Sequence, residues 1–131
     1  MEQLIDIRTL PLHTRKELIF GKIKDCVLGR SEGFTCKVSL DYPKRGYLVG
    51  TGWHEKHFDA ESLSTARNHI NQIFNSIDGK QGLYIGGWNN DGVCVVEISE
   101  GFDSLENALH VGRMRNQISI WDVEQEKEIL L

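Results

Sequence analysis

The chain has 131 residues, a hydrophobic content of 40% and a formal net charge of −4, which together are typical of a globular protein. This length predicts a single domain over residues 1–131, with room for one core but not for two. The acidic balance argues against a non-specific nucleic-acid binder, which would be basic, and is too mild for a mimic of DNA.

The ends and the cysteines indicate where the protein works. The first residues lack a basic and apolar signal peptide, and no run of eighteen apolar residues predicts a membrane span. Three cysteines lie apart in apolar surroundings, namely Cys26, Cys36 and Cys94. An odd number of isolated cysteines favours reduced, buried thiols over a disulfide framework. We therefore expect a cytoplasmic protein with neither membrane nor nucleic acid as a partner.

The first elements are a strand and a helix. Residues 4–10 predict a short strand that Pro11 ends. Thr14 and Glu17 have the spacing of a capping box, which predicts the start of a helix. Gly29 is the expected residue just beyond the end of this helix, because glycine readily adopts a positive φ there.

Two strands should follow. Apolar and polar residues alternate over residues 34–40, the period of a half-buried strand. A turn composition over residues 42–46 and a second strand over residues 47–53 predict an antiparallel hairpin.

The next segment carries the clearest helical pattern of the chain. Asp59 is the expected N-cap, and Gly79 is expected to end the helix over residues 59–78. Its apolar residues fall on one helical face, namely Leu63, Ala66, Ile70, Ile73, Phe74 and Ile77.

The C-terminal part predicts a hairpin, a helix and a strand. Strands over residues 83–88 and 93–99 flank the tight-turn sequence Asn89-Asn90-Asp91-Gly92. Asp103 or Ser104 should cap a helix that continues to about Arg113, before a strand over residues 118–123. The acidic run over residues 124–128 is interpreted as a solvated edge. Strands paired by hairpins with helices between them predict an α+β fold, in which two to three helices pack on one face of an antiparallel or mixed sheet.

The sequence offers little for catalysis or for metal binding. His54 and His57 have a spacing that can chelate zinc, but no third ligand stands at a suitable distance in the sequence. No nucleophile motif is present, and the cysteines lie in apolar segments that silence a thiol. We therefore expect no catalytic residues, no metal and no cofactor.

A basic and amide-rich segment is the best candidate for ligand binding. Arg113, Arg115, Asn116 and Gln117 stand where the third predicted helix ends. Arginine matches phosphate oxygens, while Asn and Gln can pair with the edge of a base. The alternative is structural, because cations stabilise a helix C-terminus and an asparagine often provides the left-handed cap.

Aromatic residues of the predicted hairpin complete the candidate site. Tyr84 and Trp88 alternate onto one face of their strand and can present rings for stacking, although either can equally fill the core. Asn90, in the turn beside Trp88, and Arg30, after the first helix, are further candidate ligand-binding residues.

One resemblance to known proteins covers mainly the last third of the chain. The strand with Gly86-Gly87-Trp88, the following helix and the segment Asn116-Gln117-Ile118-Ser119-Ile120-Trp121-Asp122 resemble the tail of small proteins encoded by phages and mobile elements. Among characterised phage proteins the chain is most similar to the anti-Thoeris signal-sequestering family. The resemblance implies an oligomer without catalysis in the host cytoplasm, which traps a cyclic ADP-ribose isomer or another cyclic nucleotide and so silences an immune effector.

Two other functions remain open. An inhibitor that covers a protein partner would use the acidic tail with Trp53 and Trp88. A small nucleotide-processing enzyme would use His54, His57 or His110 as acid–base groups. In all cases we expect a homo-oligomer, because the tryptophans offer more apolar surface than one small core can bury.

Overall fold

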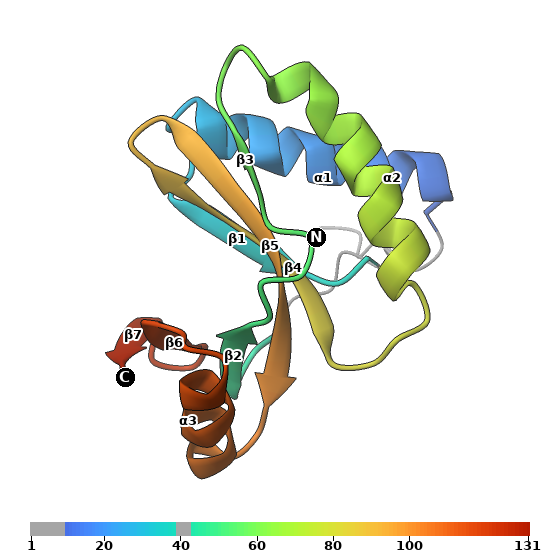
Figure 1. Cartoon of the computed structure of the whole chain (residues 1–131). Coiled ribbons are helices and arrows are strands. Elements are labelled where there is room, and N and C mark those ends of the chain that lie inside the picture. The colour runs from blue at the N-terminus through green and yellow to red at the C-terminus, as the bar shows by residue number, and fades with distance from the viewer. Residues whose placement is uncertain (1–9, 39–42) are drawn as a thin grey trace, which may run out of the picture.

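A computed structural model describes residues 10–38 and 43–131 (Figure 1). The described part is an α+β fold with three α-helices, as the sequence predicts, and with seven strands. In chain order the elements are α1 (Leu12–Val27), β1 (Gly33–Cys36), β2 (Tyr47–Gly50), β3 (Lys56–Phe58), the 3-10 helix η2 (Leu63–Thr65), α2 (Ala66–Ile77), β4 (Leu83–Asn90), β5 (Val93–Phe102), α3 (Leu105–Met114), β6 (Ser119–Asp122) and β7 (Lys127–Leu130). The strand predicted over residues 4–10 falls outside these ranges, except for Leu10.

The seven strands form one antiparallel sheet in the order β1-β4-β5-β2-β6-β7, with β3 also paired to β5. The central strand is β5, which pairs with β4 along one edge and with both β2 and β3 along the other. Residues 51–55 connect β2 to β3 as a bulge. Hydrogen bonds from Thr51 N to Ile98 O and from Ile98 N to Trp53 O hold this bulge against β5.

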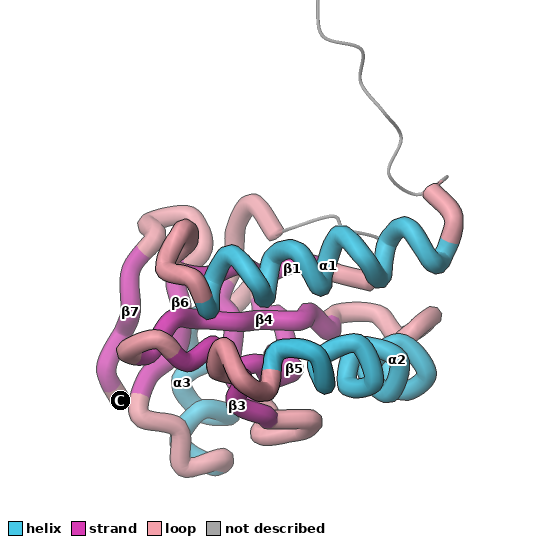
Figure 2. The backbone as a smooth tube through the Cα atoms, turned by 90° about the horizontal axis from the view of Figure 1, so that it is seen from above, coloured by secondary structure: helices cyan, strands magenta, loops and turns pink. Residues whose placement is uncertain are grey.

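All three helices bury their apolar residues on one face of the sheet (Figures 1 and 2). Helices α1 and α2 lie side by side over β1, β4 and β5, while α3 packs on β2 and β6 at the other end. The register places Val49 opposite Glu100, and hence on the same side as Ile98, so α3 covers the same face. The predicted packing of the helices on one face is therefore confirmed.

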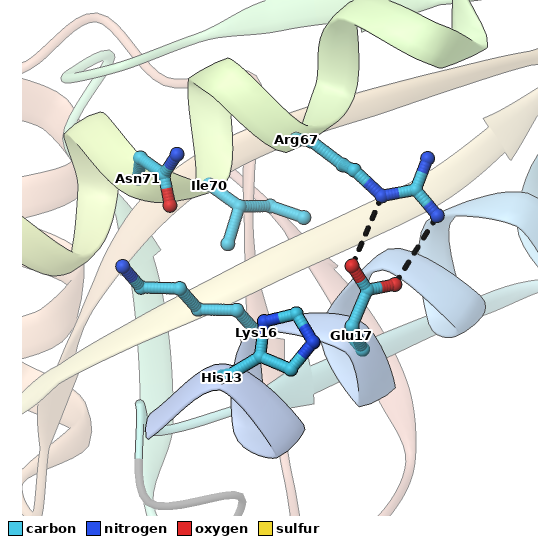
Figure 3. Close-up of a pocket in the computed structure, with 6 residues that line it drawn as sticks. All are labelled: His13, Lys16, Glu17, Arg67, Ile70 and Asn71. Carbon is cyan, nitrogen blue, oxygen red and sulfur yellow. Dashed lines mark hydrogen bonds and ion pairs between the residues drawn. The ribbon is translucent and has the colours of Figure 1, made fainter. Parts of the chain in front are cut away.

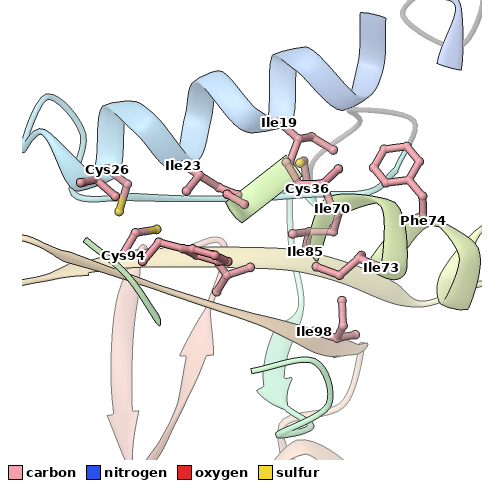
Figure 4. Close-up of a cluster of buried hydrophobic side chains, with 14 of the residues drawn as sticks. Ile19, Ile23, Cys26, Cys36, Ile70, Ile73, Phe74, Ile85, Cys94 and Ile98 are labelled. Carbon is pink, nitrogen blue, oxygen red and sulfur yellow. The ribbon is translucent and has the colours of Figure 1, made fainter. Parts of the chain in front are cut away.

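The larger core lies between α1, α2 and the sheet (Figure 4). The isoleucines Ile19, Ile23, Ile70 and Ile73 of the two helices are at most 1% exposed. The three cysteines are also buried and free, as predicted. Burial raises the pKa of the Cys36 thiol to about 11, and an uncharged thiol behaves here as a small apolar side chain.

Helix α1 begins before the predicted capping box. Pro11 is the N-cap residue, so Thr14 lies inside the first turn and its side chain makes no capping bond. Proline is well suited to a helix start because its missing N–H would have no partner there. The other end is as predicted: Gly29 has a φ of +74°, and the amides of Gly29 and Arg30 donate to the carbonyls of Cys26 and Asp25.

The second helix begins seven residues later than the predicted cap. Asp59 instead accepts hydrogen bonds from the backbone and the hydroxyl of Ser62, which closes a local turn. The short helix η2 then leads into α2, whose first residue is Ala66. The predicted end is close to the observed one, because Gly79 follows the helix with a φ of +80°.

The hairpin predicted between residues 34–40 and 47–53 is wrong. The first of these strands, β1, pairs with β4, and β2 pairs with β5 and β6. Turn composition is a local signal, whereas side-chain packing across the sheet decides the partner. Here the Phe34 ring fits over Gly87, where an added Cβ would lie only 2.5 Å from it.

The C-terminal predictions mostly hold. Asp91 and Gly92 both have positive φ values and close the predicted β4–β5 hairpin. Ser104 caps α3 by accepting a hydrogen bond from the Asn107 amide. The tail is only partly a solvated edge, because its last residues form β7 beside β6. None of the helices in residues 10–38 and 43–131 is long and apolar enough to cross a membrane.

Two glycine substitutions test this packing. Gly87→Ala should destabilise the fold by about 1–3 kcal/mol, because its Cβ would lie 2.5 Å from the Phe34 ring and 3.1 Å from the Cys94 sulfur. The control Gly21→Ala meets nothing within 4 Å on α1 and should stabilise the helix by about 0.5–1 kcal/mol. Urea unfolding measures both changes. Equal effects of the two substitutions would contradict the close contact at Gly87.

Candidate functional site

The face of the sheet opposite the helices carries no helix in the described part of the chain, and we call it the open face. The strand register places on it every second residue of β4 and β5, together with their neighbours on β2 and β6. Its principal side chains are Leu48, Tyr84, Trp88, Val95, Glu97, Ser99 and Trp121. Two of them are large and accessible, because Trp88 is 41% and Trp121 is 42% exposed.

A buried carboxylate lies on this face. Glu97 is only 8% exposed, although it belongs to a residue type that is almost never buried without a partner. A Cβ added to Gly50 would lie 2.9 and 3.2 Å from its two carboxylate oxygens, and 2.7 Å from Oε1 of Gln117. The missing side chain of Gly50 therefore leaves the space in which the carboxylate of Glu97 and the amide of Gln117 meet.

The surroundings of Glu97 disfavour its charged form. Burial raises the pKa of the Glu97 carboxyl, the Glu55 carboxylate raises it further, and the Gly52 backbone amide lowers it. No cation forms an ion pair with Glu97 within residues 10–38 and 43–131. A desolvated acid without a counter-ion is a common feature of functional sites.

A second glycine lies beside Glu97, on the neighbouring strand β4. Gly86 is paired with Glu97, and a Cβ added to Gly86 would have no atom closer than 3.8 Å. The ring of Tyr84 leans over Gly101, where an added Cβ would lie 3.0 Å from it, rather than over Gly86. We call the position above Gly86 the notch; Tyr84 and Trp88 flank it, while the carboxylate of Glu97 lies over Gly50 on the other side of β5.

Four of the predicted ligand-binding residues share the open face. Tyr84, Trp88 and Asn90 are alternate residues of β4 and point to the same side. Gln117 comes from the loop before β6 and reaches the same region beside Gly50. These residues do not form the predicted phosphate site with the arginines, because the arginines lie elsewhere.

At the end of α3 the residues show the structural role expected of arginine and asparagine at a helix C-terminus. Asn116 has a φ of +55°, and the amides of Asn116 and Gln117 donate to the carbonyls of Arg113 and Gly112. Arg115 binds the Glu100 carboxylate at 2.5 Å. Its Nη1 atom is buried and has no hydrogen-bond partner among the described residues. Arg115 and Asn116 therefore terminate the helix.

The remaining predicted residues lie away from the notch. Arg113 is exposed in the last turn of α3. Arg30 follows α1 and lies 3.7 Å from the carboxylate of Asp25, with 67% of its side chain exposed. Neither residue contributes to the geometry around Glu97.

Sequence reasoning missed Glu97 itself. The signal was present, because Glu97 is the one charged residue in the run Val93-Cys94-Val95-Val96-Glu97-Ile98. Burying an acid in a central, apolar strand costs free energy, so an acid at such a position indicates a specific site.

The histidines brace the bulge between β2 and β3. His54 has a φ of +57°, and its Nε2 lies 2.9 Å from the Ser76 hydroxyl. His69 donates from Nε2 to the backbone carbonyl of His54 at 2.8 Å. Because Ser76 gives its own proton to the Gln72 carbonyl, His54 must donate to Ser76 and cannot accept its proton. Burial lowers the pKa of His69, which favours a neutral, structural ring.

A second hollow lies between α1 and α2 (Figure 3). It has a volume of about 210 Å³ and is lined by His13, Lys16, Glu17, Arg67, Ile70 and Asn71. Arg67 already forms a two-point ion pair with Glu17, at 3.0 and 3.2 Å, and stacks 3.8 Å above the Phe20 ring. Two of its five N–H donors are therefore engaged, and its charge already has a partner.

Neither known proteins nor a metal site indicates a function for the described residues. Comparison of the chain with protein-family models, with characterised proteins and with solved structures found no match. Within the described ranges no three His, Cys, Asp or Glu residues are grouped as a metal site requires. The open face is therefore the part of the described chain that carries the candidate function.

Glu97→Gln should stabilise the fold at neutral pH. The folded state raises the pKa of Glu97, so stability is lost as the pH rises from the unfolded value of about 4 through the raised folded value. The variant's advantage in unfolding free energy should shrink as the pH is lowered towards about 4, where an ordinary Glu becomes protonated. Urea unfolding of both proteins from pH 4 to pH 7 measures it. A variant that is less stable at pH 7 would show that the charge of Glu97 is well compensated.

Proposed function

We propose that this protein binds a small nucleotide on its open face and sequesters it without changing it chemically. The observation that carries the proposal is the buried carboxylate of Glu97, which lies with Gln117 on a face that also carries the aromatic side chains of Tyr84 and Trp88. Such a site combines a flat apolar wall with a hydrogen-bond acceptor, as recognition of a nucleobase requires.

The aromatic walls suit a planar ring. Tyr84 and Trp88 are four residues apart on one strand, a separation of about 13 Å along the backbone. A nucleobase placed above Gly86 can stack on either ring, and stacking on an aromatic side chain contributes about 1–3 kcal/mol per base. Ser99 Oγ, 3.8 Å from the added Cβ of Gly86, provides a polar group at the floor.

Glu97 and Gln117 supply the hydrogen bonds to the edge of the ring. A carboxylate accepts from ring N–H groups, and hydrogen bonds to a charged acceptor are about twice as strong as neutral ones. The ligand would at the same time provide donors to an acid that lacks a cation among the described residues. This exchange makes the site selective for a ligand rich in N–H groups.

A phosphate would need a cation near the same face. The Nζ atom of Lys37 lies 5.6 Å from the centre of the Tyr84 ring, and Lys37 is exposed. In the proposed complex Lys37, rather than Arg115, contacts the phosphate. The acidic group at the centre of the site favours a position of the phosphate towards this rim.

The chemistry of the described residues supports holding rather than converting the ligand. The serine nearest to a histidine, Ser76, donates its proton to a carbonyl and is not activated by His54. Burial raises the pKa of both the Cys36 and the Cys94 thiols, which weakens them as nucleophiles. A protein that only withholds a signalling nucleotide has no need of a transition-state site. In line with the resemblance of its C-terminal third, we propose a cyclic nucleotide of an immune response as the ligand.

An exposed apolar surface favours self-association as a further part of this proposal. Met114, Ile118 and Leu130 are 70%, 82% and 73% exposed at the end of α3 and along the last two strands. The outer edge of β7 pairs with no other strand of the described chain, and such edges readily pair with a second molecule. The same surface would serve the alternative function, in which the chain covers a protein partner.

Titration with nucleotides tests the proposal. Calorimetry with guanosine and adenosine monophosphates, cyclic dinucleotides and cyclic ADP-ribose should show binding of at least one of them, recovered unchanged by chromatography. Trp88→Ala should weaken that binding by about 5- to 160-fold, the loss expected of one stacked base. Trp53→Ala is the matched control, because Trp53 has a similar exposure of 39% but its ring lies against His54 and Lys80 rather than on the open face. No binding of any nucleotide, or equal losses in both variants, would contradict the proposed site.

Light scattering tests the oligomer. Ile118→Lys places a charge on the exposed apolar surface and should shift the protein from a dimer or larger species to the monomer, because a buried lysine without a partner is costly at an interface. Met114→Gln keeps the surface uncharged and should have a smaller effect. A monomeric wild-type chain at micromolar concentration would remove this part of the proposal.

A further inference from the structure

The hollow between α1 and α2 gathers cationic and N–H-donating side chains around an open space (Figure 3). Its volume of about 210 Å³ is far above the roughly 10–15 Å³ that a single water molecule requires. Helices α1 and α2 pack on the face of the sheet opposite the open face. A ligand of several atoms therefore fits here without touching the nucleotide site proposed above.

Lys16 brings a positive charge that the described residues leave unbalanced. Its Nζ atom lies 5.6 Å from the centre of the Phe74 ring, and no carboxylate within residues 10–38 and 43–131 forms an ion pair with it. An ammonium group has three donors and no acceptor. The side chain is half-buried, and a lower local dielectric strengthens its attraction for an anion.

Arg67 supplies donors from the other helix. Its ion pair with Glu17 uses two of the five N–H groups of the guanidinium, so three remain. The same pair neutralises Glu17, because the hydrogen bond from Arg67 lowers the pKa of the Glu17 carboxyl and keeps it ionised. The two charges balance each other, and the hollow keeps the net positive charge of Lys16.

Two further side chains add neutral donors. Asn71 carries two amide N–H groups, and the ring of His13 carries at least one; both line the hollow. Figure 3 shows Lys16 reaching towards Asn71 on one side, the pair of Arg67 and Glu17 on the other, and His13 between them. The donors therefore surround one space from several sides.

We propose that this hollow binds a phosphate group, held by Lys16 and by the free N–H groups of Arg67, with Asn71 and His13 as further donors. The oxygens of a phosphate point in tetrahedral directions and accept hydrogen bonds from several sides, whereas a carboxylate accepts mainly in its own plane. A phosphate monoester also carries about −1.5 to −2 charges near neutral pH, which the charge of Lys16 favours. This site does not depend on the proposed nucleotide site.

Nuclear magnetic resonance of the full, isotope-labelled chain tests the proposal. Inorganic phosphate, titrated at constant ionic strength set by sodium chloride, should shift the backbone amide signals of Lys16, Arg67 and Asn71 along one saturable curve. Acetate should bind at least about fivefold more weakly, because a planar carboxylate reaches fewer of these donors. Shifts that do not saturate, or equal affinities for acetate and phosphate, would overturn the proposal.

Matched variants assign the binding to the hollow. Lys16→Gln should weaken phosphate binding by at least about fivefold, because it removes a charge-assisted hydrogen bond. Lys24→Gln removes the same charge from an exposed position in the last turn of α1. This position is about 12 Å further along the helix, so the affinity should stay within about twofold.

A third variant covers the case in which Lys16→Gln does not fold, as a melting temperature would show. Asn71→Ala alters an exposed residue of α2 and should weaken binding by about two- to fivefold. Equal affinities of the wild type, Lys16→Gln and Asn71→Ala would overturn the site.

A phosphate monoester identifies the source of the ligand. Glycerol phosphate should also bind, because the hollow is lined by the exposed side chains of His13, Arg67 and Asn71 and is open to solvent. Binding at least as tight as that of inorganic phosphate would support a phosphorylated small molecule, and tighter binding of inorganic phosphate would support the free ion. If neither compound shifts the signals of the hollow, the proposal fails, while the nucleotide site on the open face is unaffected.

Discussion

The pairing of β5 on both of its edges is the constraint on which the rest of this molecule depends. Because β5 is held between β4 on one side and β2 with β3 on the other, its register cannot change without moving every side chain to the opposite face. Val96 and Ile98 are thereby committed to the core under α1 and α2. The same register places Glu97, between them in sequence, on the open face, where its carboxylate is less solvated than that of an exposed acid.

Three glycines determine which side chains can lie against this part of the sheet. Gly50 leaves room for the Glu97 carboxylate, and a Cβ added at Gly86, on the other side of β5, would lie 3.8 Å from Ser99 Oγ. Gly87, one residue further along β4, serves the opposite face by admitting the Phe34 ring to the core. Two consecutive glycines in one strand weaken its intrinsic stability, so their presence here is explained by what approaches the backbone from each side. A buried acid without a cation among the described residues is likewise unfavourable for folding alone and is typical of a functional site.

Helix α3 links the core to the open face. Its apolar side rests on Val49 and Ile120, and its end is fixed by the left-handed Asn116 and by the ion pair of Arg115 with Glu100. These residues place Gln117 beside Glu97. The ion pair between Glu17 and Arg67 joins α1 to α2 at the surface, and as an exposed pair it contributes little to stability compared with the isoleucine core beneath it.

The sequence by itself determined the α+β class, the one-sided packing of the helices, the turn at Asp91-Gly92, the Ser104 cap and the shared face of Tyr84 and Trp88, because each of these depends on a periodicity or on a φ preference a few residues long. It predicted the wrong partner for β1 and did not indicate the ion pair of Arg115 with Glu100, since strand pairing and ion pairs join residues that are separated in the chain. Glu97 and Gly50 are 47 positions apart, Gln117 is 20 positions beyond Glu97, and no local pattern indicates that they meet. Only the tertiary structure decided this, because the contact arises where β2 and the loop after α3 reach the same point on β5.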